Sequence, residues 1–227
     1  AAAGAAAGAE AGAGVAADAG QMATDEERRD AYTLPTLRWV QLMCFLDFFA
    51  VSLIIPLLAT YFKAAGGSQQ QYGLLSSLYS ISQLVGGVAM GVLSDNLSKR
   101  RILLISFAGS GLSYLLIGFS NVACLFFSRI LVGLVKQTMT VCTLLVTDST
   151  KHQPPSSRSQ ALAQTSSAVS LAFFVGSPLG GLLYRLRPWL PSVAAAAIFV
   201  ANMGVCAYLG PTDEALRAKE GQGEGVG

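Results

Sequence analysis

The stretch Gly91-Val-Leu-Ser-Asp95-Asn-Leu-Ser-Lys99-Arg100-Arg101 lies between two long apolar runs of the chain. It places one acidic residue shortly before three consecutive cations, at the mouth of a hydrophobic segment. Charges beside apolar runs are expensive to bury and belong at a water-facing surface. We therefore interpret the stretch as a tight turn between two buried segments, with a function beyond connecting them.

The composition around this turn is that of a membrane protein. Of the 227 residues, 52% are hydrophobic and 12% are charged, and the mean hydropathy is +0.52, whereas about a quarter of the residues in a soluble domain are charged. A helix needs about 20 mostly apolar residues to cross a bilayer, and backbone polar groups in lipid must be satisfied within each segment. The sequence predicts an all-α membrane protein, a six-transmembrane-helix bundle, with apolar runs at 39–62, 72–94, 101–119, 123–147, 160–184 and 189–210.

The two ends of the chain differ from this bundle. Residues 1–37 are rich in Ala and Gly and predict a disordered cytosolic arm, residues 38–210 form the predicted bundle, and residues 211–227 begin a polar cytosolic linker. The sequence has no initiator Met and trails off in a Gly-rich stretch. We expect the chain to be a piece of a longer protein.

Several classes of function are excluded by the residues present. A net charge of +2 is too small to indicate nucleic-acid binding. The four Cys fall inside apolar runs at spacings that fit neither a metal site nor a disulfide framework, and His152 lies in a predicted loop. We expect no metal, no cofactor and no enzymatic activity; a Ser/His protease is excluded because its only histidine would lie outside the membrane.

The cations are distributed unevenly between the two sides of the predicted bundle. Ten of the 15 Lys and Arg fall on the side that carries both termini, which the positive-inside rule assigns to the cytosol. The opposite side carries three, and two lie inside a run. The ten are Arg28, Arg29, Arg38, Lys99, Arg100, Arg101, Lys151, Arg158, Arg217 and Lys219.

Three charged residues lie inside apolar runs, where each costs about 2.5–3.5 kcal/mol to insert and marks function by default. Arg129 and Lys136 are seven residues apart, so on one continuous helix they share a face with Thr140. At about 1.5 Å per residue, Asp47 lies about 12 Å, Lys136 about 16 Å and Arg129 about 27 Å from the cytosolic ends of their runs. We hypothesise that Asp47 and Lys136 face each other across a water-filled cavity, with Arg129 nearer its outer end. Protonating Asp47, or neutralising it with a cationic ligand, would release Lys136. The alternative is a buried structural ion pair. Gln83 is a further candidate to line the cavity, or else to make a hydrogen bond between helices.

The charged turn resembles the signature of the major facilitator superfamily, G-x-x-x-D-R-x-G-R-R, which lies between the second and third spans. Asn96, Ser98 and Lys99 depart from that pattern. Arg129-x-x-x-Gly133 resembles the arginine motif of the superfamily, and Asp148 stands where it has an acidic partner for the signature. Gly176-Ser-Pro178-Leu-Gly180-Gly181 resembles the glycine-proline motif of antiporters.

Within the superfamily, Leu46-Asp47-x-x-Ala50 through Pro56 resembles the first helix of tetracycline-resistance-like drug:proton antiporters. The run from Gly133 to Asp148 is similar to relatives of major facilitator superfamily domain-containing protein 9.

This resemblance implies a twelve-helix carrier of which the chain is the N-terminal six-helix half, in a membrane and with both termini cytosolic. It implies alternating-access transport of a small organic solute, coupled to protons, with the missing C-terminal half or a second copy as partner. A non-transporting six-helix scaffold, or a truncated transporter product, is the alternative. By position, Gly91, Asp95, Lys99, Arg100 and Asp148 would form a gating latch. Helix packing is assigned to Gly87, Gly133, Gly176, Pro178, Gly180 and Gly181.

Overall fold

The computed structural model describes residues 37–150 and 154–208, except for the side chains of residues 94–96 and 148. Within these residues the chain is helical and contains no strand, and six helical spans are long and apolar enough to cross a membrane. The expected all-α fold of six spans is therefore confirmed. The arm expected at 1–37, apart from its last residue, and the linker expected at 211–227 lie outside the described residues. The spans are Leu37–Ala64, Gln69–Leu93, Lys99–Ile117, Val122–Thr147, Pro155–Leu186 and Leu190–Tyr208.

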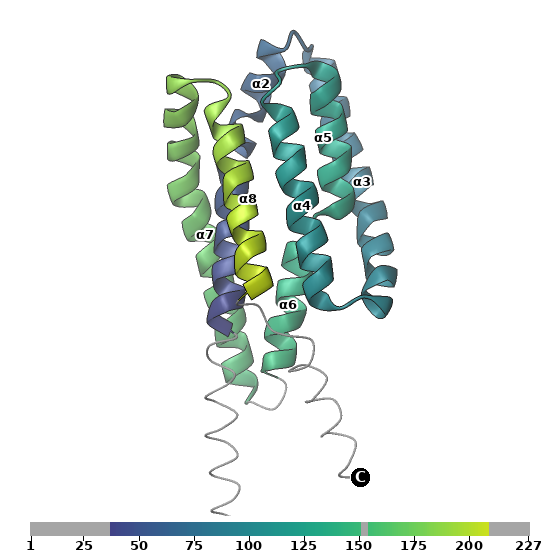
Figure 1. The fold of residues 1–227 in the computed structure, drawn as a ribbon, viewed down its shortest axis with the longest axis vertical. Coiled ribbons are helices and arrows are strands. Elements are labelled where there is room, and N and C mark those ends of the chain that lie inside the picture. The colour runs from purple at the N-terminus through teal and green to yellow at the C-terminus, as the bar shows by residue number, and fades with distance from the viewer. Residues whose placement is uncertain (1–36, 151–153, 209–227) are drawn as a thin grey trace, which may run out of the picture.

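The spans stand side by side as one bundle (Figure 1). The first consists of a helix over residues 37–52, the short 3-10 helix η1 (Ile55–Leu57) and α2 (Leu58–Ala64). The others are formed by α3 (Gln69–Asn96), α4 (Lys99–Ile117), α5 (Val122–Val135) with α6 (Thr138–Ser149), α7 (Pro155–Leu186) and α8 (Leu190–Tyr208). Helix α4 packs against α8 and α5, and α3 packs against α5.

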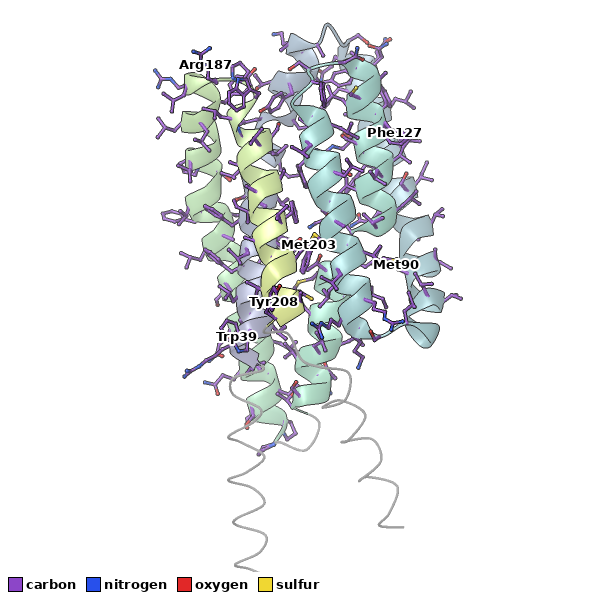
Figure 2. The ribbon with its side chains drawn as sticks, in the orientation of Figure 1. Trp39, Met90, Phe127, Arg187, Met203 and Tyr208 are labelled. Carbon is purple, nitrogen blue, oxygen red and sulfur yellow. The ribbon has the colours of Figure 1, made fainter. Side chains whose placement is uncertain are left out.

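The first and last described helices begin and end at the same side of the bundle. Figure 2 shows Trp39 and Tyr208 at one end and Arg187, between α7 and α8, at the opposite end. Helices α7 and α3 lie at opposite edges (Figure 1), and they have the smallest buried shares among the spans, 17% and 22%. These two helices are therefore the least covered spans of the bundle.

Local sequence sets where several helices begin. The side chain of Ser68 accepts a hydrogen bond from the backbone N–H of Gln71, and the side chain of Gln71 accepts one from the N–H of Ser68, which together form a capping box at α3. Ser98 caps α4 and Asn121 caps α5 in the same side-chain-to-backbone manner. These polar residues satisfy amide donors that each helix start would otherwise leave unpaired.

Two spans are interrupted in their middle, which the sequence analysis did not predict. The first span leaves regular helix at residues 53–57, around Pro56. The fourth is broken at Lys136 and Gln137, where Lys136 has φ −79° and ψ 90°. The expectation of one continuous helix over 123–147, with Arg129 and Thr140 on one face, is therefore wrong. Non-helical backbone at membrane depth is tolerated only where it is buried in protein or lines a cavity.

Glycines allow α3 and α5 to touch through their backbones. A Cβ added to Gly86 would lie 2.6 Å from the Cα of Leu134, and one added to Gly133 would lie 2.7 Å from the Cβ of Ser82. Real Cβ atoms do not approach other atoms this closely, so both positions need glycine. Helix α3 thus has its close contact at Gly86 rather than at Gly87, whose Cβ would meet only the side chain of Gln137, at 3.7 Å.

The glycine-proline segment of α7 packs in the same way against the first span. Gly176 faces Ser52, and Gly180 faces the backbone of Leu53, in both cases too closely for a side chain. Gly181 has open space where its Cβ would stand, and Pro178 is exposed. The packing expected of this segment is therefore made by Gly176 and Gly180, and the structure shows no close approach at Gly181.

Candidate functional site

The structure brings together the two charged residues that the sequence analysis paired across the first and fourth spans. The Nζ of Lys136 lies 2.6 Å from Oδ2 of Asp47 and donates a hydrogen bond to it. The side chain of Asp47 is fully buried, and that of Lys136 is 11% exposed. The pair is a direct contact, so the water-filled gap expected between the two residues is absent from this conformation.

The break in the fourth span places this pair between two helix ends. Lys136 is the C-cap of α5, where the carbonyl end of the helix favours a cation, and Thr138 begins α6, where the amide end favours an anion. The hydroxyl of Thr138 donates to Oδ1 of Asp47 at 3.3 Å, so the carboxylate lies beside the start of α6. A discontinuous helix that offers both partial charges inside an apolar bundle can bind an ion or a charged ligand.

Two hydroxyl groups connect the carboxylate of Asp47 to neighbouring helices. The hydroxyls of Thr138 and Ser106 are 3.2 Å apart, which links Asp47 to α4. The sequence analysis missed Thr138 and Ser106, although the position of Thr138, two residues after an intramembrane lysine, was an available signal. Both hydroxyls are buried, at 1% exposure each. Thr138 donates directly to the carboxylate of Asp47, and Ser106 reaches it only through its contact with Thr138.

Aromatic rings surround the ammonium of Lys136. Its Nζ lies 5.5 Å from the ring centroid of Phe48 and 5.4 Å from that of Phe199, which are cation–π distances. The sequence analysis did not single out Phe48, which the structure places beside the ammonium. Phe199 stacks on Tyr114 with centroids 5.4 Å apart, and the guanidinium of Arg129 lies 5.8 Å from the ring of Tyr114 on α4. A stacked pair of rings therefore separates the two intramembrane cations.

Arg129 lies at a different place from the ion pair. It is 3% exposed, and it lines a cavity of about 230 Å³ between η1, α2, α3 and α5. Neither Asp47 nor Lys136 lines this cavity, so the single vestibule expected for all three charges is divided into a closed ion pair and a separate cavity at Arg129. The other lining residues are Ile55, Leu58, Tyr72, Leu75, Ser76, Tyr79 and Ser80.

The remaining candidates are spread along the bundle. Gln83 is exposed on α3 and does not reach the ion pair. Arg100 donates to the backbone carbonyl of Ala207, so it binds the C-terminal end of α8. Lys99 begins α4, Gly91 is exposed on α3, and the side chains of Asp95 and Asp148 lie outside the described structure. The five gating residues therefore remain a prediction.

Comparison with known proteins identifies the family of the chain. The family model of the Major Facilitator Superfamily matches residues 40–226. The chain is 31% identical over 161 residues to the class H tetracycline resistance protein of Pasteurella multocida, an alignment that covers 69% of this chain and 40% of the relative. It is 33% identical over 153 residues to major facilitator superfamily domain-containing protein 10 of Bos taurus, covering 66% of this chain and 32% of that protein. The matches are to protein 10, and the expected likeness to protein 9 remains untested.

A solved structure has the same fold. The crystal structure of the human organic anion transporter MFSD10 (TETRAN) superposes with a TM-score of 0.67 at 23% sequence identity. The superposition covers 79% of this chain and 48% of that one. The chain thus spans about half of the solved structure, and less than half of the length of the two relatives above.

Proposed function

The chain belongs to the major facilitator superfamily, a family of membrane transporters, and on that premise we propose that it forms part of a secondary active transporter. The solute is a small organic molecule, its movement is coupled to protons, and access alternates between the two sides of the membrane. The observation that carries the proposal is the ion pair of Asp47 and Lys136 at a helix break inside the bundle.

The pair can act as a switch because each partner depends on the other for its stability in a low-dielectric site. Protonation of Asp47 removes the negative charge that Lys136 binds at 2.6 Å. The ammonium is then left with the rings of Phe48 and Phe199, which stabilise it less than a carboxylate does. A solute or a second conformation that compensates Lys136 becomes favourable at that point, which couples proton binding to solute movement.

The names of the relatives indicate the kind of solute. The similar proteins include tetracycline resistance proteins, a multidrug resistance protein of Bacillus subtilis, and an organic anion transporter. All of these names refer to the movement of, or resistance to, small organic molecules. We assign the same broad class of solute to this chain.

A second six-helix bundle completes the transport path in this proposal. The exposed apolar faces of α3 and α7 provide surface for such a partner, since only 22% and 17% of these spans are buried. The second bundle is either further sequence of the same protein or another copy of this chain. Both termini lie in the cytosol, and Asp95, Lys99, Arg100 and Asp148 act as a latch at the cytosolic ends of the helices, where charged groups can be paired or separated as the bundles rock.

The transport proposal predicts uptake that follows a pH gradient. The intact protein, reconstituted in liposomes, is expected to accumulate tetracycline when a proton gradient is imposed, and to stop when nigericin collapses the gradient. In the Lys136→Gln variant the charge that responds to Asp47 is gone, so we expect gradient-driven uptake to fall by at least about tenfold, the change that 1.4 kcal/mol of lost coupling produces. A matched Lys63→Gln variant, at an exposed lysine of α2, should transport normally.

Uptake that ignores the gradient in the native protein would overturn proton coupling. If a range of neutral, cationic and anionic drugs all failed to be transported by folded protein, the non-transporting scaffold would be the better assignment.

The orientation predicts that Asn96 escapes glycosylation. Asn96-Leu-Ser98 is an acceptor sequon, and it lies at the end that carries most of the cations. When the protein is expressed in a eukaryotic secretory pathway, this site should remain unmodified. A sequon engineered beside Arg187, at the opposite end (Figure 2), should be used. The reverse pattern in a gel-shift assay with glycosidase would invert the topology.

A further inference from the structure

Arg129 is a buried cation inside a span, and it takes no part in the ion pair of Asp47 and Lys136. Its Nε and Nη2 atoms are buried and have no hydrogen-bond partner among the described residues. A buried guanidinium normally has its donors paired, because leaving them unmade costs more than a hydrogen bond contributes. Tyr114 contacts the guanidinium, whose carbon lies 5.8 Å from the ring centroid, and forms a side-chain hydrogen bond with Arg129, but Nε and Nη2 remain without a partner.

The two unpaired atoms define the shape of the missing partner. Nε and Nη2 lie along one edge of the guanidinium plane and direct two parallel N–H groups outward. This fork matches the two oxygens of a carboxylate, which accept both bonds at once. A single charge of opposite sign would also offset the desolvation of the buried arginine.

The cavity at Arg129 has room for such a partner and walls that suit its remainder. Its volume is about 230 Å³, somewhat below the 300–1,000 Å³ of typical drug sites, which fits the carboxylate end of a larger solute or a small aromatic acid. No acidic residue is among those that line it. Ile55, Leu58, Leu75 and the rings of Tyr72 and Tyr79 supply apolar walls.

The cavity opens at the surface of the bundle and has Arg129 at its buried end. Ile55 is 40% exposed, and Ser76 and Ser80 are exposed on α3, whereas Arg129 is 3% exposed. The serine hydroxyls donate to backbone carbonyls one turn earlier, at 3.1 Å, so they do not compete with the guanidinium for an anion.

We propose that the cavity at Arg129 binds the carboxylate of a small organic anion, with Nε and Nη2 gripping its two oxygens and the rings of Tyr72 and Tyr79 against its apolar body. This inference rests on the proposed function, because it names the solute class that the transporter takes. The stacked rings of Tyr114 and Phe199 lie between Arg129 and Lys136. An anion that neutralises Arg129 would therefore change the electrostatic field at the ion pair across these two rings.

The test measures binding without transport. The purified intact protein, in lipid nanodiscs, is incubated with radiolabelled benzoate and challenged with unlabelled benzoate, its neutral isostere benzamide, or chloride. We expect saturable binding that benzoate displaces and that benzamide and chloride do not. The Arg129→Gln variant should bind benzoate about 10- to 100-fold more weakly, the range for losing a charged hydrogen-bond pair.

Two further variants control for folding and for charge. Arg129→Lys keeps the charge and loses the fork, so its affinity should also fall and its fold should be retained. Arg185→Gln removes an exposed arginine near the end of α7 and should bind like the native chain. Displacement by benzamide as strong as by benzoate, or native affinity in Arg129→Lys and Arg129→Gln, would overturn the proposal. Displacement by chloride would overturn the assignment of an organic acid, because the site would then bind an inorganic anion. No gradient is applied, so binding can be measured even if the protein does not transport. Transport that is unchanged when Arg129 is substituted would overturn this inference and leave the proposed transport function standing.

Discussion

Replacement of Asp47 by Asn should lower the free energy of unfolding by about 3–5 kcal/mol, since it leaves the ammonium of Lys136 without its partner in a buried site. The side chain of Asp47 is fully buried and that of Lys136 is 11% exposed, so water compensates little of the lost interaction. Asn also cannot accept the bond from Thr138 in a charge-assisted form. The measurement is reversible unfolding of the purified protein in mixed detergent micelles.

A double variant distinguishes a functional pair from a structural one. Asp47→Leu combined with Lys136→Met removes both charges at similar volume, and buried pairs replaced by apolar residues are often neutral or stabilised. We expect this protein to be about as stable as the native chain and yet to have lost gradient-driven uptake. If the double variant were as unstable as Asp47→Asn, the pair would be holding the bundle together, and its role as a switch would be disproved.

The spans and the ion pair could be predicted from the sequence because both follow from the free-energy cost of placing residues of each run in the membrane. A run of about 20 apolar residues has few alternatives to a spanning helix, and the cost of a charge inside such a run favours pairing it with an opposite charge. Depth estimated along each helix was enough to select Lys136 over Arg129 as the partner of Asp47, as the 2.6 Å contact shows.

The break of the fourth span could not be predicted in the same way. Val135, Lys136, Gln137 and Thr138 contain neither Pro nor Gly, so no local signal ends the helix. The break is set by the rest of the bundle: Asp47 binds Lys136 at the end of α5 and Thr138 at the start of α6. In the first span Pro56 did offer a signal, since proline removes a backbone donor inside a helix. Arg129 was assigned to the same cavity as the pair because the spacing along a continuous helix was assumed.

The glycines show a similar limit. Gly86 and Gly87 are adjacent, and a G-x-x-x-G spacing from Gly91 selects Gly87. The structure instead turns Gly86 toward α5, because the rotation of α3 is decided by the helix that packs against it. Gly133, on the facing helix, lies against Ser82 and completes the contact.

Substitution of Gly86 by Ala should destabilise the bundle by about 3 kcal/mol, at the upper end of the usual cost of overpacking. The added methyl would lie 2.6 Å from the Cα and 2.7 Å from the carbonyl carbon of Leu134. These are backbone atoms, which cannot rotate away, so α3 and α5 must separate. Leu134 precedes Lys136 by two residues, so the displacement reaches the end of α5 and the ion pair. The same unfolding measurement and the uptake assay should therefore both show a loss.

Gly73→Ala is the matched control, because it makes the same change in the same helix where nothing lies within 4 Å of the added methyl. There the substitution should be neutral or stabilise α3 by about 0.5–1 kcal/mol, since alanine loses less conformational entropy than glycine in a helix. The difference between the two variants isolates the backbone contact from helix propensity. Equal stability of Gly86→Ala and Gly73→Ala would mean that α3 and α5 do not touch at Gly86. The placement of α5, which carries Arg129 and ends at Lys136, would then be wrong.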